Sequence, residues 1–364
     1  MKITNVQPML IAVPYEHGGP KPARAGGAWD TMDTLFVRVE TDAGIVGWGE
    51  SFGFAVSPVT MTAIARIVAP LCVGRDPTDI PGLMADLRRK VQNMGRNGPV
   101  GFALSGIDIA LWDIAGKLAD RPIHHLLAGR RKTRIPTYAS LLRYGAPDLV
   151  ARNAAKAVAR GYSHIKLHES TVETVAAARS AVGAEVALML DTNCAWTPDE
   201  AVAMAHRLEE YDLTWLEEPV SPPDDYAALA RLRGAANVPV AAGENAGNVN
   251  DINQMFSIGA VDVVQPSVTK IGGIAEMRKA IALAESHGVT VAPHSPYFGP
   301  GLIATLHVIA AMDRDVLCER FYCDLAASPL AGAVDATDGY MRVPDGPGLG
   351  VDIDERTIER YRIG

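Results

Sequence analysis

Three carboxylates in the middle of the chain stand at the ends of short apolar runs. Asp191, Glu217 and Glu244 each close such a run, and the three runs follow one another along the chain. Any one of these acids alone could be a solvated strand end or a helix N-cap. Three carboxylates brought together would repel one another and raise one another's pKa, unless a hard cation that prefers oxygen ligands lay between them. The pattern therefore predicts a Mg²⁺ site.

Side chains suited to proton transfer accompany these acids. Lys166 and His168 are two residues apart, so in a strand they face the same side, and Asp191 and Asn193 share a side by the same rule. A lysine beside a bound carboxylate can offset the charge of a developing enediolate, and a lysine or a histidine can remove the α-proton. The alternative for Lys166 and His168 is an exposed polar strand end.

Two further candidates come later in the chain. His294 follows the seventh apolar run, nearly opposite the second run in a barrel, where it could reach the other face of a substrate. A lone buried histidine is otherwise usually structural. Glu319 closes the eighth run and could accept a hydrogen bond from a substrate carboxyl group, or could form a salt bridge with Arg320 or another arginine.

These residues need a scaffold that brings the ends of the runs together. From about residue 134, short apolar runs alternate with amphipathic helical stretches, which is typical of repeated βα units around a parallel sheet. Eight units of roughly 25–30 residues predict a closed barrel whose strands present their carboxyl ends at one face. The runs span residues 135–141, 164–168, 186–193, 214–218, 238–244, 261–267, 290–295 and 316–320.

The flanking segments indicate a second unit. Alternation at residues 34–40 and helical periodicity around 106–112 indicate an α+β start, whereas the turn-rich segment 344–350 follows the eighth run with no amphipathic helix between. We therefore predict an α+β capping domain over residues 1–125, completed by residues 325–364, and a barrel domain over residues 126–324. Within the barrel, Thr197, Pro198 and Glu200 predict a helix start with a capping box.

Composition excludes several classes of protein. The net charge is -8 and no basic run stands out, which disfavours nucleic acid as a partner. The polar start and the lack of an uninterrupted run of about 18 apolar residues predict a cytoplasmic protein without a membrane partner. The four scattered cysteines predict reduced structural thiols. Gly-rich segments such as 44–50 lack the strand-to-helix context of a dinucleotide-binding fingerprint.

The chain resembles the enolase superfamily, in its mandelate racemase and acid-sugar dehydratase branch, over nearly its whole length. Besides the three carboxylates, the resemblance rests on Gly47-Trp48-Gly49-Glu50, on the segment 103–113 and on Lys270-Ile271-Gly272-Gly273. It implies a modified (β/α)7β TIM barrel with an α+β N-terminal capping domain that the C-terminal tail completes.

The resemblance also implies roles for individual residues. Asp191, Glu217 and Glu244 would bind Mg²⁺, which holds the carboxylate of a small-molecule substrate, and loops near residues 13–29 and 51–54 would close over the site and choose that substrate. A homo-oligomer, often an octamer, is implied as well. The residues expected beside the ligands, for substrate binding or support, are Asn193, Asn245, Ser267 and Lys270.

Two positions depart from the racemase pattern. Where that branch has Lys-x-Lys on the second strand, this chain has His168 as the second residue. Where the racemase has an aspartate that partners the seventh-strand histidine, this chain has Ser267, which cannot supply the charge that makes His294 a stronger base. Muconate-lactonising enzymes and dipeptide epimerases carry a lysine base at that position, so Ser267 argues against those activities, and Lys270 matches a separate lysine.

These departures favour one reaction of the superfamily. A racemase needs a competent base on each face of the substrate, whereas a dehydratase can use one base for the α-proton and one acid for the departing hydroxyl. We expect dehydration of an acid sugar or related hydroxy acid to a 2-keto-3-deoxy acid, with His168 as base, Lys166 as electrostatic partner and His294 as acid. The alternatives are racemisation or epimerisation of a hydroxy or amino acid derivative, and a metal-binding homologue that has lost catalysis.

Overall fold

Eight parallel strands curl into a barrel in the computed structural model of the chain, which describes residues 1–24, 27–127 and 132–363. The strands are β6 (Arg134–Leu141), β7 (His164–Leu167), β8 (Ala187–Asp191), β9 (Leu213–Glu217), β10 (Val240–Ala242), β11 (Val263–Val264), β12 (Thr290–Val291) and β13 (Cys318–Tyr322). Each strand from β6 to β11 pairs with the next one along the chain, β13 pairs with β6, and the sheet path ends at β12. The predicted α/β barrel is confirmed.

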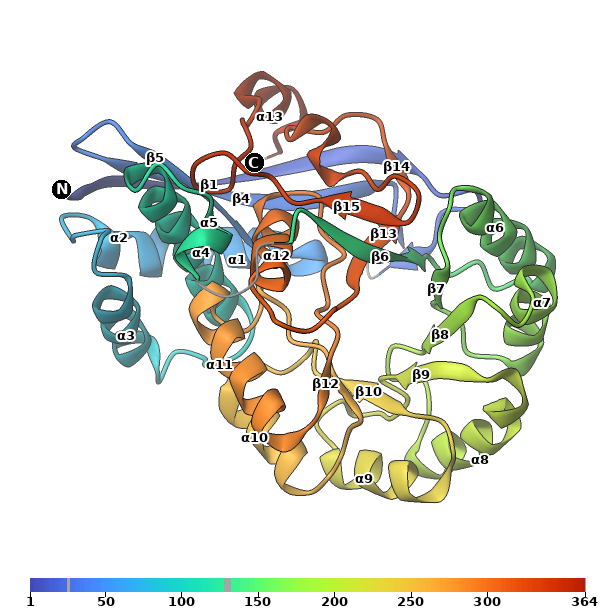
Figure 1. The fold of residues 1–364 in the computed structure, drawn as a ribbon. Helices are drawn as coiled ribbons and strands as arrows, with labels where there is room; N and C mark the ends of the chain where they lie inside the picture. The colour runs from blue at the N-terminus through green and yellow to red at the C-terminus, as the bar shows by residue number, and fades with distance from the viewer. Residues whose placement is uncertain (25–26, 128–131, 364) are drawn as a thin grey trace.

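Seven helices alternate with these strands and form the outer ring (Figure 1). They are α6 (Pro147–Ala159), α7 (Val172–Val182), α8 (Pro198–Leu208), α9 (Tyr226–Ala235), α10 (Val249–Ser257), α11 (Gly273–His287) and α12 (Pro300–Ala310). The predicted start of α8 is confirmed, because Thr197 and Glu200 form a capping box. No amphipathic helix directly follows β13 in the described chain, so the order is (β/α)7β.

Side chains fill the inside of the barrel, which is therefore a packed core and no pore. Its interior cluster is separate from the larger core between the strands and the surrounding helices. The buried members of the interior cluster are Tyr138, Met189, Trp215, Ala241, Val263 and Ala292. The chemistry is thereby confined to the mouth of the barrel.

Several strands end earlier than the sequence predicted. β11 covers only 263–264 of the expected 261–267, and β12 covers only 290–291 of the expected 290–295. Single hydrogen bonds between neighbouring segments continue past these points, from the amide of Ala292 to the carbonyl of Val264 and from that of His294 to the carbonyl of Pro266. Glu244, Ser267 and His294 lie just past the ends of the strands. An apolar run marks a buried segment but does not show where its backbone pairing stops.

An antiparallel sheet with the strand order β14-β1-β4-β5 lies beside the barrel (Figure 1). Its strands are β1 (Ile3–Glu16), β4 (Thr31–Thr41), β5 (Val46–Ser51) and β14 (Asp324–Leu325), and β2 (Ala23–Arg24) pairs with β3 (Gly27–Ala28) separately. The helical elements on this side are η1 (Phe54–Val56), α1 (Ser57–Ala63), η2 (Ile64–Val68), α2 (Ala69–Cys72), α3 (Ile80–Val91), α4 (Pro99–Leu118) and α5 (Ile123–Leu126).

Two glycines explain why β5 and α4 pack so closely. A Cβ atom at Gly47 would lie 2.2 Å from the carbonyl oxygen of Ala110, and one at Gly49 would lie 1.9 Å from that of Gly106. The strand and the helix therefore meet backbone to backbone, which no residue with a side chain would allow. This contact gives a physical reason for the Gly-Trp-Gly sequence of β5.

The C-terminal tail contacts both parts of the molecule. β14 pairs with β1, and the amide of Ile363 donates to the carbonyl of Leu10 in the same sheet. Between these points, β15 (Tyr340–Arg342) pairs with the barrel strand β6. The remaining elements of the tail are η4 (Ala331–Val334) and α13 (Glu355–Tyr361). The predicted boundary between the domains near residue 125 stays a prediction.

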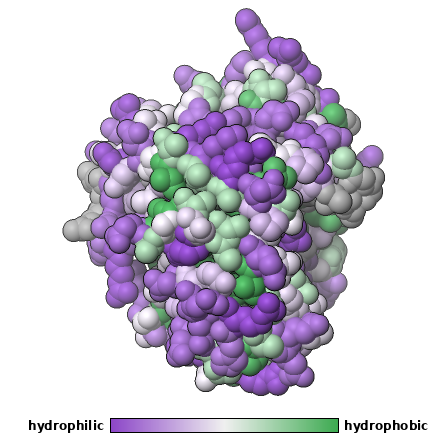
Figure 2. Space-filling view, turned by 90° about the vertical axis from the view of Figure 1, so that its right-hand side faces the viewer, coloured by the Kyte–Doolittle hydropathy of each residue, from purple (hydrophilic) through white to green (hydrophobic). Residues whose placement is uncertain are grey.

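Two helical segments, 54–72 and 99–118, are long and apolar enough by length and composition to span a membrane. Core helices of soluble proteins share this property, and 78% of the apolar window in α4 is buried inside the molecule. On the face seen in Figure 2, hydrophilic residues dominate and hydrophobic residues gather only in small groups. All four cysteines lie in the described chain and are free, as predicted.

Candidate active site

Asp191, Glu217 and Glu244 converge at the mouth of the barrel. Asp191 and Glu217 are the last residues of β8 and β9, and Glu244 lies two residues past β10. Each residue offers one carboxylate oxygen, and these three oxygens lie within 4.8 Å of one another. Neighbouring parallel strands end at the same edge of the sheet, and the sequence prediction that these acids meet is therefore borne out by the geometry.

The three carboxyl groups differ in their proton affinity. Burial raises the pKa of Glu217 to about 8, despite the nearby Lys166 ammonium. Burial alone would also raise the pKa of Asp191, but Lys166 and His168 together hold it below its usual range. The same opposition applies to Glu244: burial is the largest single influence and would raise its pKa, but His294, Lys270 and Lys166 together hold the pKa well below normal. Neighbouring cations thus decide which of these buried acids stay ionised.

Lys166 lies beneath this group of acids and is fully buried. Its Nζ is 2.8 Å from Oε1 of Glu217, 2.9 Å from Oε1 of Glu319 and 3.4 Å from Oδ2 of Asp191. Burial would lower the pKa of Lys166, but these carboxylates raise it well above its ordinary value. A lysine that holds its proton this firmly is suited to electrostatic support.

His168 reaches the same acid from the end of β7. Its Nε2 is 3.1 Å from Oδ2 of Asp191, so Lys166 and His168 share a side, as the two-residue spacing predicted. Its Nδ1 is 2.5 Å from the carbonyl oxygen of Leu141. A carbonyl can only accept a hydrogen bond, so Nδ1 keeps its proton and Nε2 is the nitrogen available for proton transfer.

His294 approaches the other end of the row of acids. Its Nε2 is 2.7 Å from Oε2 of Glu244, and its Nδ1 is 3.3 Å from the hydroxyl of Tyr297. That hydroxyl in turn contacts the Ser267 hydroxyl. His294 therefore has a neutral Tyr297–Ser267 pair behind it, where an aspartate would place a negative charge. Tyr297 carried no signal in the sequence, because only the tertiary structure places it between the two predicted residues.

Glu319 is held by three groups of the protein. Its Oε1 accepts a 2.7 Å hydrogen bond from Ser140 in addition to the ion pair with Lys166, and its Oε2 accepts a 2.9 Å bond from the amide of Ser295. The prediction that Arg320 could pair with it is wrong: Arg320 faces the opposite side of β13 and lies 3.6 Å from Asp335. Adjacent residues of a strand point to opposite faces.

Comparison with known proteins agrees with this arrangement. Residues 149–357 match the family model for the enolase C-terminal domain-like region, and residues 19–128 match that for the mandelate racemase / muconate lactonizing enzyme N-terminal domain. The chain belongs to the mandelate racemase / muconate lactonizing enzyme family of the enolase superfamily. The resemblance seen in the sequence is thus confirmed.

Relatives of the family cover almost the full chain. It is 33% identical to the D-galactarolactone cycloisomerase of Agrobacterium fabrum over 100% of this chain and 99% of that protein. It is 32% identical to the arabinonate dehydratase of Saccharolobus solfataricus over 93% of this chain and 92% of that protein. A mandelate racemase/muconate lactonizing protein of Paracoccus denitrificans, complexed with magnesium, superposes with a TM-score of 0.88, 27% identity and coverage of 100% and 98%. Acid-sugar dehydratases and cycloisomerases are therefore among its relatives.

The donor set fits the ion of this enzyme family. Enolase-superfamily sites work with Mg²⁺, and Mg²⁺ prefers oxygen ligands such as the three carboxylates gathered here. Glu217 supports this assignment, because a fully buried acid with a pKa raised to about 8 needs a compensating positive charge to be ionised near neutral pH. Asp191, Glu217 and Glu244 are the residues that would hold the ion.

The four residues expected beside the ligands lie there. Asn193 donates to Oδ1 of Asp191 through its amide and its side chain, at 2.8 and 2.9 Å. Lys270 is 2.9 Å from Oε1 of Glu244 and donates to Asn245 at 3.3 Å. Ser267 supports Tyr297, as described above. Each therefore orients a carboxylate or a candidate acid of this family member.

Sequence reasoning missed Glu218, which directly follows a ligand. Its carboxylate accepts two hydrogen bonds from Asn245, at 2.8 and 2.9 Å, and burial raises its pKa well above the ordinary value. Its φ of 43° turns it away from the course of β9. The doubled acid Glu217-Glu218 was the available signal, but only the tertiary structure shows that Glu218 meets Asn245, the residue that follows Glu244.

A cavity of about 600 Å³ opens above the carboxylates. His168 and His294 both line it, and the cap contributes Trp29, Phe52 and Phe54 from the two loops that the sequence assigned to substrate choice. Residues 25 and 26 of the first loop lie outside the described residues. The cavity also exposes two cations that the sequence did not single out, Lys21 and Arg143. Its volume suits a small organic acid.

Proposed function

We propose that this enzyme dehydrates an acid sugar or a related hydroxy acid to a 2-keto-3-deoxy acid. The observation that carries the proposal is the unequal environment of the two histidines at one carboxylate cluster. His168 has a fixed tautomer beside Asp191, whereas His294 is backed by a neutral hydroxyl of Tyr297. One base and one acid at the two ends of a site suit a β-elimination.

The two proton transfers then have assigned atoms. Nε2 of His168 takes the α-proton of the substrate, and the electron pair of that C–H bond forms the enediolate. Loss of the β-hydroxyl follows, with a proton from Nε2 of His294 so that it leaves as water, and the enol tautomerises to the 2-keto acid. When bound, Mg²⁺ would hold the substrate carboxylate and stabilise the negative charge on it.

Lys166 supplies a positive charge that remains in place during these steps. Its ion pairs with Glu217 and Glu319 fix the ammonium beneath the carboxylates, so its field needs no reorganisation as charge develops. Lys21 and Arg143 provide cations on the cavity wall that could orient a second carboxylate or hydroxyl groups of the substrate. The cap loops would exclude water.

A second candidate is opening of a sugar-acid lactone, because one relative that spans the whole chain is a D-galactarolactone cycloisomerase. The α-proton is removed in the same way, but the leaving group is then the ring carboxylate and needs no strong acid. Racemisation or epimerisation remains the alternative in which the enediolate is reprotonated. It needs a second effective base, which the Tyr297–Ser267 pair does not favour.

One experiment separates these reactions. A panel of acid sugars, their lactones and hydroxy acids is incubated with the protein and Mg²⁺ in D₂O and followed by proton NMR. Loss of the α-proton signal with formation of a 2-keto-3-deoxy acid from an open-chain acid supports dehydration. The same product from lactones alone supports the second candidate, and stereochemical scrambling without a keto acid supports epimerisation. No α-proton exchange with any substrate would support a silent homologue.

Location and assembly are further parts of the proposal. The expected cytoplasmic location and the expected homo-oligomer, an octamer by family resemblance, remain predictions, as does the absence of nucleic-acid and membrane partners. Sedimentation of the purified protein would measure its oligomeric state directly.

A further inference from the structure

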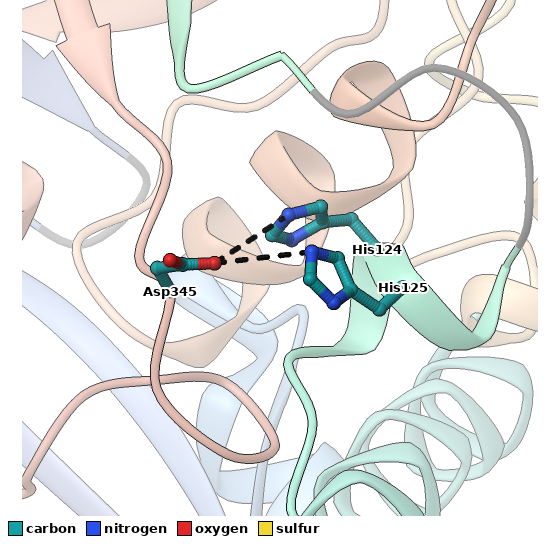
Figure 3. A group of neighbouring side chains, drawn as sticks. All are labelled: His124, His125 and Asp345. Carbon is teal, nitrogen blue, oxygen red and sulfur yellow. Dashed lines mark ion pairs between the residues drawn. The ribbon is translucent and has the colours of Figure 1, made fainter.

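A second group of possible metal ligands lies away from the barrel mouth, where α5 meets the C-terminal tail (Figure 3). His124 and His125 are the two central residues of α5, and Asp345 belongs to the tail. Nε2 of His124 is 4.0 Å from Oδ1 of Asp345, and Nε2 of His125 is 3.9 Å from the same oxygen. One ligand atom from each residue lies within 4.8 Å of the others.

The backbone sets the position of Asp345. The amide of Ile123 donates to the carbonyl of Gly348 at 2.9 Å. The amide of Gly348 donates in turn to the carbonyl of Arg121 at 3.0 Å. Gly348 has φ +69°, and a Cβ atom there would lie 2.1 Å from Oδ1 of Asp113. The tail is therefore docked on the end of α4 and on α5 by its own hydrogen bonds, so the three side chains meet without help from an ion.

Hydrogen bonding fixes which nitrogen of His124 carries a lone pair. Nε2 of His307 lies 3.0 Å from the carbonyl oxygen of Leu349, which can only accept, so this nitrogen carries the proton. Nδ1 of His307 is then an acceptor, and the partner 2.9 Å away, Nδ1 of His124, must donate to it. Neutral His124 consequently has its lone pair on Nε2, the atom that faces His125 and Asp345.

This chain of hydrogen bonds is the arrangement that supports histidine ligands in metal sites. A ligating imidazole ordinarily donates its other ring N–H to an acceptor, which fixes the tautomer and the orientation of the ring. Here His307 is that acceptor for His124, and both are buried. The rings of His124 and His307 stack with an interplanar angle of 16°, so His124 is also held by packing.

The other two ligands leave the site open to solvent. The ring of His125 stands at 80° to that of His124, with centroids 4.6 Å apart, so both Nε2 atoms point toward the same carboxylate (Figure 3). The side chain of Asp345 is 76% exposed and that of His125 is 22% exposed. An ion can therefore enter from solvent, and water can complete its coordination.

We propose that His124, His125 and Asp345 form a site for a divalent transition metal of the Zn²⁺ class, which ties the tail to α5. Two imidazoles and one carboxylate suit Zn²⁺, Co²⁺ or Ni²⁺, whereas Mg²⁺ selects oxygen ligands such as those at the barrel mouth. Bonds of about 2.0–2.1 Å place neighbouring tetrahedral ligands roughly 3.3 Å apart. The exposed Asp345 carboxylate can close the difference from 3.9–4.0 Å by rotation about its side-chain bonds.

The test is Zn²⁺ titration by calorimetry into the full-length protein saturated with Mg²⁺, so that the barrel carboxylates are occupied. We expect about one equivalent of Zn²⁺ to bind the unmodified protein, and His125→Ala and Asp345→Ala each to weaken this binding at least tenfold. Both positions are solvent-accessible, so the fold should be kept. Co²⁺ added in place of Zn²⁺ should give visible absorption from imidazole ligation in the unmodified protein, and this absorption should be lost in His125→Ala and Asp345→Ala.

The matched control is His206→Asn. His206 is an exposed histidine on α8 whose Nδ1 lies 3.2 Å from Glu209, so it offers an imidazole and a carboxylate without the third ligand. Its replacement should leave Zn²⁺ binding unchanged. The proposal is overturned if His125→Ala and Asp345→Ala bind Zn²⁺ as the unmodified protein does, or if none of these proteins binds Zn²⁺, because the group is then only a pair of histidines beside an acid.

Discussion

The two histidines of the active site approach the same row of acids from its two ends, but different groups hold them in place. A backbone carbonyl, that of Leu141, fixes His168, and Asp191 faces its reactive nitrogen. His294 depends on side chains instead, with Tyr297 and Ser267 behind it. A carbonyl cannot donate and so keeps a proton on Nδ1 of His168, whereas the hydroxyl behind His294 can donate or accept and so does not dictate whether Nδ1 of His294 carries a proton. This is the reason why we assign His168 as the base and His294 as the acid.

Removing the metal should affect the work of both histidines, and it should have the largest effect on α-proton exchange. Dialysis against EDTA should abolish α-proton exchange, because the substrate carboxylate would lose the cation that holds it and would meet the ionised carboxylates of Asp191 and Glu244. Exchange is measured by proton NMR in D₂O, and Mg²⁺ added back should restore it. Undiminished exchange in metal-free protein would contradict the assignment of the three acids.

Replacing His168 separates the two histidines most directly. His168→Asn should lower α-proton exchange by roughly 10²–10⁴-fold, the usual contribution of a general base, and should leave Mg²⁺ binding intact. Exchange in D₂O and Mg²⁺ titration by calorimetry provide the two measurements. Exchange at the unmodified rate would move the base to Lys166 or His294.

The matching replacement of His294, at the other end of the row of acids, should affect a different step of the reaction. His294→Asn should reduce formation of the keto acid by about 10²-fold or more while α-proton exchange continues, because the acid acts only when the hydroxyl leaves. Both rates come from the same NMR experiment. If His294→Asn lost exchange while His168→Asn kept it, the two roles would be reversed.

Removing the Tyr297 hydroxyl behind His294 should have a smaller effect on the reaction. Tyr297→Phe removes the hydroxyl that contacts both Nδ1 of His294 and the Ser267 hydroxyl. We therefore expect kcat to fall roughly tenfold with little change in KM. The pH dependence of kcat should shift as well, which a purely structural defect would not cause. Tyr162 is a buried tyrosine outside the cavity, so Tyr162→Phe serves as the control. Its kcat and pH dependence should match those of the unmodified enzyme.

Glu50 joins the cap to the segment that follows His294, and not to the segment that carries His168. Its replacement should have the smallest effect of the changes considered for the two histidines. Its Oε2 accepts a 2.7 Å hydrogen bond from the amide of Gly301 at the start of α12, which follows the loop that carries His294. Burial raises the pKa of Glu50 from 4.5 to about 8. Between these pH values the folded state binds the proton more tightly than the unfolded state, so the free energy of unfolding should fall as the pH rises from about 4.5 to about 8.

Glu50→Gln tests this dependence by removing the titrating group. The contribution of this group to the pH dependence should disappear, and it amounts to at most about 5 kcal/mol across the window. Urea unfolding at several pH values measures it. Glu185→Gln, which changes an exposed glutamate, should keep the pH dependence of the unmodified protein. Identical slopes in Glu50→Gln and the unmodified protein would show that Glu50 stays ionised in the fold.

The barrel and the row of acids could be predicted from the order of residues alone. Parallel strands are buried on both faces and therefore read as apolar runs, and each of Asp191, Glu217 and Glu244 is placed by the run before it. The capping box at Thr197 is a local pattern and was predicted for the same reason. These features depend on neighbours along the chain, which a sequence displays directly.

The groups that hold the catalytic side chains became apparent only in the folded molecule. Tyr297 stands between Ser267 and His294, Lys166 and not Arg320 pairs with Glu319, and a tail residue, Asp345, meets the histidines of α5. Each of these contacts joins segments that the chain brings together only after folding. Hydrogen bonds and ion pairs act over about 3–4 Å and depend on side-chain direction, so the order of residues could not reveal them.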